Sequence, residues 1–414
     1  MTGIKGWLNS LLGKEEILAN DLPPERSDSV LNTFGEDNNR LALTLFASLR
    51  AQPGNLFFSP FSIRTALGMT YAGAADETAQ QMKTALHFSQ VDELLHLEFR
   101  QLIGRLNAAG GGRYELAVAN ALYGQDGSSL QDQFLELITE QYRGVVKLVD
   151  FRHAAEAVRT EINDWVADKT KQRITGLIPA GGLSAESRLV LVNAVYFKGR
   201  WLLPFDKAST REEKFYLEGG EQVPAQLMNQ QQTIRYVQAR GFQAVDLDYQ
   251  GDDLSLLVLL PDRKGGLKDL ETNLSVRTLD DCLRRMSHCE VKLSLPRFKI
   301  GWGVIDLREQ LIALGMSDAF DRARANFLRI NGLRPPHEDA LFVSAVFHKA
   351  FVEVNEEGTE AAAATAVTME RMMSVANYNP PPIPVFRADH PFLFAIRDRR
   401  SSAILFLGRV TDPR

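Results

Sequence analysis

The chain has 414 residues, of which 45% are hydrophobic and 24% are charged, and its formal net charge is −5 at pH 7. These proportions are typical of a soluble globular protein that buries a large core. The negative net charge argues against a nucleic acid or an anionic membrane as partner. No uninterrupted apolar run reaches the roughly 18 residues that a membrane span needs.

Residues 1–31 are predicted to be an N-terminal extension. One helical face of this segment carries apolar side chains, namely Ile4, Trp7, Leu8, Leu11 and Leu12. We interpret it as a short packed or partner-seeking helix, with an interfacial membrane anchor as the alternative. Polar residues and glycine break the apolar run, so we recognise no signal peptide. An intracellular location is therefore the default expectation, and an extracellular one stays open. Residues 20–30 are predicted to be a linker.

The patterns become dense from residue 32 onward. Helical periodicity predicts helices over 35–50, 61–75, 76–87 and 154–172, the second of which starts with the capping pair Ser59-Pro60. Alternating or continuous apolar runs predict strands over 113–123, 188–198, 243–248, 253–260, 289–299, 341–354, 391–397 and 403–410. No repeat or charge block divides the chain, so we expect one large α+β body over residues 32–414.

Cys282 and Cys289 are the two cysteines of the chain. They are too few for a disulfide framework and form no CxxC pair that would suggest zinc. We interpret them as small hydrophobic side chains or free thiols, and the alternative is a bridge that closes a short loop. The seven histidines lack metal-ligand spacing. We expect neither a metal nor a cofactor.

Residues 356–373 form a stretch of small side chains between a predicted strand and a proline-rich segment. With a period of two, Thr359, Ala361, Ala363 and Thr365 share one face, and Glu360 lies on the other. One interpretation is an alanine-rich helix or a surface linker. The other is a segment that can be a loop or a central strand, as a conformational switch requires.

Residues 356–365 (EEGTEAAAAT) closely resemble the hinge signature of the serpins, the serine protease inhibitors. Four further parts of the chain resemble the same family in the same order. They are 55–62 (NLFFSPFS), 191–201 (LVNAVYFKGRW), 347–356 (FHKAFVEVNE) and the C-terminal pair 390–394 and 406–410. The resemblance covers roughly residues 32–414.

The resemblance implies a serpin fold with three β-sheets, about nine helices and an exposed reactive-centre loop at about 356–384. It implies a serine-type endopeptidase inhibitor that acts as a suicide substrate. The protease cuts the loop and forms an acyl-enzyme, and the cut loop inserts into sheet A, a recognised case of strand addition. The alternatives are a non-inhibitory serpin that acts as a binding or chaperone protein, and an inhibitor of cysteine proteases. We expect the protein to be a monomer. We expect no enzymatic activity, because no GxSxG, HExxH or P-loop motif is present.

The resemblance also assigns the loop residues. The hinge comprises Gly358, Thr359, Glu360, Ala361, Ala362, Ala363, Ala364 and Thr365. Non-inhibitory relatives typically carry charged, bulky or proline residues there, so this hinge favours inhibition. Loop spacing places the reactive bond at Met372–Met373, which would suit an elastase-, chymotrypsin- or subtilisin-like protease. The alternative, Arg371–Met372, would suit a trypsin-like protease. The segment that follows is longer and richer in proline than is usual in the family.

Two further groups of residues match the family. Ser59, Ser62, Asn193 and His348 match the shutter, a buried polar cluster under the strands that must part. The alternative is four separately satisfied polar residues. Trp201, Arg297 and Glu356 match the breach, where insertion begins. An Arg297–Glu356 ion pair is expected there, with arginine in place of the lysine typical of the family.

Overall fold

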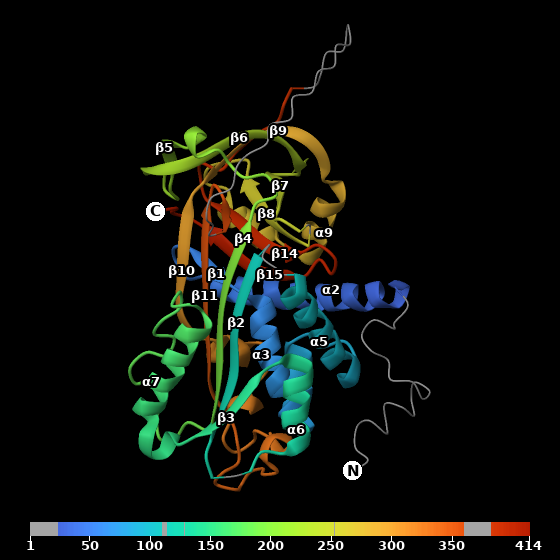
Figure 1. Cartoon of the computed structure of the whole chain (residues 1–414), viewed down its shortest axis with the longest axis vertical. Coiled ribbons are helices and arrows are strands. Elements are labelled where there is room, and N and C mark those ends of the chain that lie inside the picture. The colour runs from blue at the N-terminus through green and yellow to red at the C-terminus, as the bar shows by residue number, and fades with distance from the viewer. Residues whose placement is uncertain (1–23, 110–113, 128, 252, 360–381) are drawn as a thin grey trace.

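A computed structural model of the chain describes residues 24–109, 114–127, 129–251, 253–359 and 382–414. Within these ranges the chain forms ten α-helices and two hydrogen-bonded β-sheets, which confirms the mixed α+β class. The long strands run along the longest axis of the molecule, with most helices around their lower half (Figure 1). No helix in the described ranges is both long and apolar enough to cross a membrane.

The helices are α2 (Pro24–Leu49), α3 (Pro60–Gly73), α4 (Asp76–Ala85), α5 (Asp92–Ala109), α6 (Asp132–Leu137), α7 (Phe151–Lys169), α8 (Leu267–Asn273), α9 (Val276–Arg285), α10 (Arg308–Ala313) and α11 (Leu328–Asn331). Helix α3 is buried along its whole length. Ser59 caps it by accepting a hydrogen bond from the backbone N–H of Ser62, and Pro60 occupies its first turn. The predicted start of this helix is therefore confirmed to within one residue.

The six-stranded sheet has the order β10 (Phe298–Asp306), β11 (Val343–Asn355), β12 (Gly358–Thr359), β4 (Leu189–Arg200), β2 (Tyr114–Gln125) and β3 (Val145–Val149). Strands β11 and β4 pair directly and in parallel from Val343 opposite Leu189 to Phe351 opposite Tyr196. The two-residue strand β12 lies between their ends and is antiparallel to both. One face of β4 packs against the main core and the other against residues of α7.

The nine-stranded sheet contains β1 (Leu56–Phe58), β15 (Ile404–Val410), β14 (Phe392–Asp398), β8 (Leu254–Pro261), β7 (Phe242–Asp248), β6 (Gln222–Gln238), β9 (Ser287–Pro296) and β13 (Val385–Arg387) in that order, with β5 (Arg211–Tyr216) on β6. The family resemblance implies three sheets, but the described strands form two. The reason is that β6 is one continuous strand, which pairs with β5 and β9 along most of its length and with β7 at its end.

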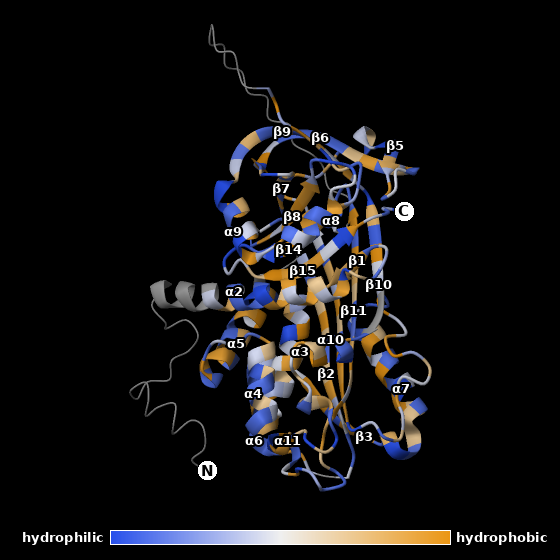
Figure 2. Cartoon of the chain, turned by 180° about the vertical axis from the view of Figure 1, so that it is seen from behind, coloured by the Kyte–Doolittle hydropathy of each residue, from blue (hydrophilic) through white to orange (hydrophobic). Residues whose placement is uncertain are grey.

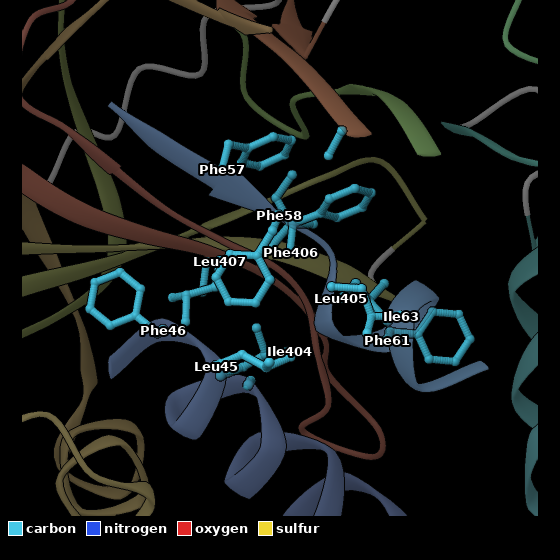
Figure 3. Packing of buried hydrophobic residues seen from close by; sticks show 14 of the residues in the cluster. Leu45, Phe46, Phe57, Phe58, Phe61, Ile63, Ile404, Leu405, Phe406 and Leu407 are labelled. Atoms are coloured by element: carbon cyan, nitrogen blue, oxygen red, sulfur yellow. The ribbon is translucent and has the colours of Figure 1, made fainter. Parts of the chain in front are cut away.

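The main core lies between the two sheets and helices α2 and α3. Figure 3 shows Leu45 and Phe46 of α2 beside Phe406 and Leu407 of β15. The ring of Phe57 in β1 stacks on that of Phe406, with 5.3 Å between the centroids. Apolar residues concentrate on the inner strands, whereas the outer helices carry polar faces (Figure 2). Each fully buried side chain of this size stabilises the fold by about 1.5–3 kcal/mol.

Two predicted elements need correction. The linker predicted over 20–30 is wrong in its second half, because α2 begins at Pro24, and proline is compatible with the first turn of a helix. The strand predicted over 289–299 is two strands, β9 and β10, which end and begin on either side of Arg297. Sequence patterns also missed α5 and the long strand β6.

Candidate functional site

The predicted hinge enters the six-stranded sheet with its first two residues. Thr359 lies opposite Gly199 of β4 on one side and Val354 of β11 on the other. Its side chain is fully buried, and its Oγ1 lies 2.8 Å from the hydroxyl of Tyr249. Thr359 therefore lies on the inward face, as the period of two predicts, and its hydroxyl has the partner that a buried polar group needs.

Gly358 is the point where the backbone turns into β12. Its φ is 144°, a conformation that residues with a Cβ rarely adopt. A Cβ on this residue would lie 2.0 Å from the carbonyl oxygen of Gly199 and 2.7 Å from Cα of Arg200. Backbone atoms cannot give way as a flexible side chain can. Glycine is therefore required at 358 for the chain to pass between β11 and β4.

The rest of the loop lies outside the described residues. This applies to hinge residues Glu360, Ala361, Ala362, Ala363, Ala364 and Thr365, and to the candidate reactive bonds Met372–Met373 and Arg371–Met372. The described part of the site therefore ends at Thr359.

A charged pair fixes the chain just before the hinge. Arg297 donates from Nε to Oε1 of Glu356 over 2.6 Å, and the hydroxyl of Thr210 donates to the same oxygen over 2.5 Å. The Glu356 side chain is 2% exposed, whereas Arg297 is 42% exposed. Burial alone would raise the pKa of Glu356, but the hydrogen bonds from Arg297 and Thr210 outweigh it and leave the pKa below its usual value. The structure thus contains the ion pair expected from the sequence.

Trp201 holds the backbone of the same segment. Its indole Nε1–H donates to the carbonyl of Asn355 over 2.9 Å, and its backbone N–H donates to the carbonyl of Glu357 over 3.0 Å. The backbone N–H of Phe205 donates to the carbonyl of Glu356 over 2.8 Å. The indole also stacks on Tyr249, with 4.7 Å between the ring centroids. Trp201, Arg297 and Glu356 therefore meet at one place, and sequence reasoning missed their neighbours Tyr249 and Thr210.

The four predicted cluster residues form one hydrogen-bonded network below β12. The backbone N–H of Ser59 donates to Nε2 of His348 over 3.1 Å, and Nδ1 of His348 bonds to Oδ1 of Asn193. Nδ2 of Asn193 donates to the carbonyl of Ser62 over 3.1 Å and to its Oγ over 2.5 Å. Sequence reasoning missed a fifth member, Asn120, which accepts from Asn193 across β2 and β4.

The network defines the protonation state of His348. Nε2 accepts a hydrogen bond from a backbone N–H, so the proton of the neutral ring lies on Nδ1 and points to Asn193. Full burial lowers the pKa of His348 to about 3. The ring is therefore neutral at physiological pH. Because β11 contributes His348 and β4 contributes Asn193, the network joins the two strands that flank β12.

The remaining chemistry-bearing residues lie elsewhere. Cys282 is buried and Cys289 is partly buried, and both are free thiols, so the alternative of a bridge between them is wrong. Burial raises the pKa of Cys282 to about 11. In the described ranges no group of His, Cys, Asp and Glu residues is arranged to hold a metal ion.

Strand β12 thus lies between the ends of two strands that are parallel to each other. Comparison with known protein families identifies the class to which this chain belongs. The family model described as Serpin (serine protease inhibitor) matches residues 36–413. The chain therefore belongs to the serpin family, which is a family of protease inhibitors and not of enzymes.

Relatives and solved structures agree with this assignment. The chain is 38% identical to human Serpin B3 over 403 residues, which cover 92% of this chain and 100% of that relative. It is 38% identical to human leukocyte elastase inhibitor over 386 residues, which cover 91% and 98%. The crystal structure of uncleaved ovalbumin superposes with a TM-score of 0.81 at 28% identity, covering 92% of this chain and 99% of the other. The native thermophilic serpin Tengpin gives 0.81 at 27% identity, covering 92% and 94%.

Proposed function

We propose that this serpin inhibits a serine protease as a suicide substrate. The protease cuts the loop that follows β12, and the cut loop inserts into the six-stranded sheet. The observation that carries the proposal is the position of β12. Gly358 and Thr359 already hydrogen-bond to β11 and β4 on both sides. Beyond them β11 and β4 pair with each other, so further insertion only needs these two strands to part.

The register of β12 predicts how far along the sheet the inserted loop would reach. Continued residue by residue from Thr359 opposite Gly199, it would bring Met369 opposite Leu189, the first residue of β4. On the other side it would bring Glu370 opposite Val343, the first residue of β11. The inserted strand would therefore have no further partner on either side from residue 371 onward. A protease joined to Met372 or Arg371 would be carried to the opposite end of the sheet.

The same register separates the two faces of the inserted strand. The face of Thr359 would also carry Ala361, Ala363, Thr365, Val367 and Met369, and it would point toward the main core, as Thr359 does. Small side chains suit this face because the interior is already close-packed. The composition of the hinge therefore supports insertion over a permanently exposed loop.

We further propose Met372–Met373 as the reactive bond, with Arg371–Met372 as its rival. In the same proposal, Ser59, Ser62, Asn193 and His348 act as the shutter that holds β4 and β11 together. Trp201, Arg297 and Glu356 act as the breach through which the loop enters. Three hydrogen bonds to the backbone of residues 355–357 support the second assignment, because they fix the point from which the loop departs.

The experiment is incubation of the protein with elastase, chymotrypsin, subtilisin and trypsin, followed by SDS electrophoresis and mass spectrometry of the released C-terminal fragment. We expect an SDS-stable complex with at least one protease of the apolar-pocket class, and a fragment that starts at Met373. A fragment starting at Met372 with trypsin would select the rival bond.

The matched variant is Thr359→Arg, which places a charge in a fully buried site. It should be cleaved at the same bond and form little or no complex. Clean cleavage of the unaltered protein by all four proteases, with no complex and no rise in thermal stability, would overturn the proposal in favour of a non-inhibitory serpin.

A further inference from the structure

A group of charged side chains is buried where helices α2, α3 and α5 meet (Figure 1). Arg64 of α3 is 0% exposed, Asp37 of α2 is 3% exposed and Glu98 of α5 is 1% exposed. Two carboxyl groups and one guanidinium therefore share an interior position from which water is excluded. The proposed inhibitory function uses none of the three.

The guanidinium of Arg64 is held in one place. Its Nη2 lies 3.6 Å from Oδ2 of Asp37 and donates to the carbonyl of His87 over 3.3 Å. Aromatic rings also surround the guanidinium carbon, with their centroids 4.5, 5.0 and 5.6 Å away, and these are the rings of Phe34, Phe88 and Phe99. Burial lowers the pKa of Arg64 only to about 10, so its positive charge is kept at neutral pH.

Asp37 has the partners that an ionised carboxylate needs. Its Oδ2 accepts a hydrogen bond from the backbone N–H of Ser89 over 3.2 Å and from the Ser89 hydroxyl over 2.6 Å. Its Oδ1 lies 3.9 Å from Nη1 of Arg40. These donors and Arg64 favour the charged form of Asp37. The charge of Arg64 therefore already has its counter-ion.

Glu98 lacks such partners. Within the described part of the chain, its Oε1 is buried and has no hydrogen-bond partner. An ionised Glu98 would lose its hydration without gaining donors, and it would add a second negative charge beside Asp37. Burial raises the pKa of Glu98 to about 8, because the attraction of Arg64 is too weak to offset it and Asp37 adds to the rise.

The other titratable groups around the cluster do not supply a balancing charge near neutral pH. Nδ1 of His96 lies 2.7 Å from the hydroxyl of Tyr142, and burial lowers the pKa of His96 to about 4 and raises that of Tyr142 well above its usual value. Burial also lowers the pKa of His87. Asp92, at the start of α5, pairs with Lys83 over 3.0 Å. The charge of Glu98 is therefore the one in this group expected to change between pH 7 and pH 9.

We propose that Glu98 is a proton-dependent switch: its neutral carboxyl group holds α5 against α2 and α3, and loss of the proton above neutral pH loosens α5. The cause is a second buried carboxylate with no further cation to balance it. Between the ordinary pKa of 4.5 and about 8, the folded protein binds a proton at Glu98 that the unfolded chain does not. The stabilisation is therefore complete below pH 4.5 and is lost as the pH rises through about 8.

The direct test is an NMR titration of the full chain with 13C at the side-chain carboxyl groups of Asp and Glu. We expect one signal with a midpoint at about pH 8, and this signal should be absent from Glu98→Gln. If no carboxyl group titrates above pH 7, the proposal is overturned, whether or not the variant folds. A signal that persists in Glu98→Gln and disappears in Asp37→Asn places the proton on Asp37 and overturns it as well.

Urea unfolding measures the effect on stability. Glu98→Gln keeps the shape of the side chain and stays neutral at every pH. The unfolding equilibrium constant of the unaltered protein, divided by that of Glu98→Gln, should rise about fivefold between pH 7 and pH 8. Glu93→Gln, at an exposed position of the same helix, should give a ratio that does not change with pH. A constant ratio for Glu98→Gln would contradict the switch.

Amide hydrogen exchange over Asp92–Ala109 measures the coupling to α5. After correction for the intrinsic effect of pH, protection of these amides in the unaltered protein should fall about tenfold from pH 7 to pH 9. In Glu98→Gln it should stay constant, and α7 should show no change in either protein. Unchanged protection of α5 while Glu98 titrates overturns the coupling. Because no readout uses a protease, failure of this inference is distinguishable from failure of the proposed function.

Discussion

The hydroxyl of Tyr249 lies 2.8 Å from Oγ1 of Thr359, and both side chains are fully buried. Tyr249 follows the last residue of β7 in the nine-stranded sheet, whereas Thr359 belongs to β12 in the six-stranded sheet. One hydrogen bond therefore ties the first inserted residues of the loop to the other sheet. The Tyr249 ring is itself held by stacking on Trp201, so the hydroxyl has little freedom to find another partner.

Tyr249→Phe should lower the free energy of unfolding by about 1–2 kcal/mol, because it leaves the Thr359 hydroxyl buried without a partner. Urea unfolding measures the change. Thr359→Val removes the other hydroxyl with little change of shape, and the double variant completes a thermodynamic cycle. We expect a coupling energy of about 1 kcal/mol. Strict additivity of the two single changes would show that the hydroxyls do not stabilise one another.

Gly358→Ala should convert most of the inhibitor into a substrate. The new Cβ would lie 2.0 Å from the backbone oxygen of Gly199, so β12 could not form without displacing β4. The ratio of cleaved protein to SDS-stable complex measures the effect, and we expect it to rise at least about tenfold, since backbone strain of this kind costs roughly 1–3 kcal/mol. Gly219→Ala is the control, because Gly219 also has a positive φ but no atom within 4 Å of the methyl that alanine would add. A similar ratio in both variants would contradict the steric argument.

The sequence predicted those elements whose signal is local. The capping pair Ser59-Pro60 predicted the start of α3, and apolar runs predicted β4, β8 and β11. Strand β6 was not predicted because its central residues are glutamines on both faces of the strand. One face points to solvent and the other lines a cavity. The contact of Tyr249 with the hinge was not predicted because its partner, Thr359, is 110 residues away in the sequence. Resemblance identified Trp201 and Glu356, but only the packed sheets show which neighbours they contact.

Arg297→Ala should speed heat-induced polymerisation. It removes the charged partner of a carboxylate that is 2% exposed and leaves Thr210 as the side chain that donates to it. We expect a loss of about 1–3 kcal/mol at the point where the sheet opens, and an opened sheet accepts the loop of a neighbouring molecule. Native gel electrophoresis after mild heating gives the rate. Lys299→Ala, which breaks the exposed pair with Glu353, should leave that rate near the unaltered value.

The free energy of unfolding should fall as the pH falls from the usual pKa of His348 toward its lowered pKa in the folded protein. Burial lowers the pKa of His348 in the folded protein to about 3 from a usual value of 6.5. Between these two pH values the unfolded chain binds a proton at this ring and the folded protein does not. The stabilisation is complete above about pH 6.5 and is lost toward pH 3, at up to about 1.4 kcal/mol per pH unit. His96, with a pKa lowered by burial to about 4, adds to the same slope.

Urea unfolding at a series of pH values checks this expectation. In His348→Gln the slope should become shallower, because a buried histidine whose pKa is lowered no longer contributes. His288→Gln, at an exposed position of β9, should keep the full slope. An unchanged slope in His348→Gln would show that the proton is taken up elsewhere.

Lys198 should assist the insertion of the one charged hinge residue. The register of β12 would bring Glu360 opposite Lys198 on β4 and opposite Glu353 on β11. An opposite charge directly across two strands contributes about 0.2–1 kcal/mol. Lys198→Glu replaces this attraction by repulsion, so the stoichiometry of inhibition should rise about two- to fivefold.

Two variants make this outcome specific. Lys214→Glu makes the same change of net charge on the exposed strand β5 and should leave the stoichiometry unaltered. The exchange Lys198→Glu with Glu360→Lys restores an attractive pair and should recover most of the inhibition. If the exchange is no better than Lys198→Glu alone, the inserted strand does not follow the register set by Thr359 and Gly199, and the proposed end of the insertion near residue 370 has to be moved with it.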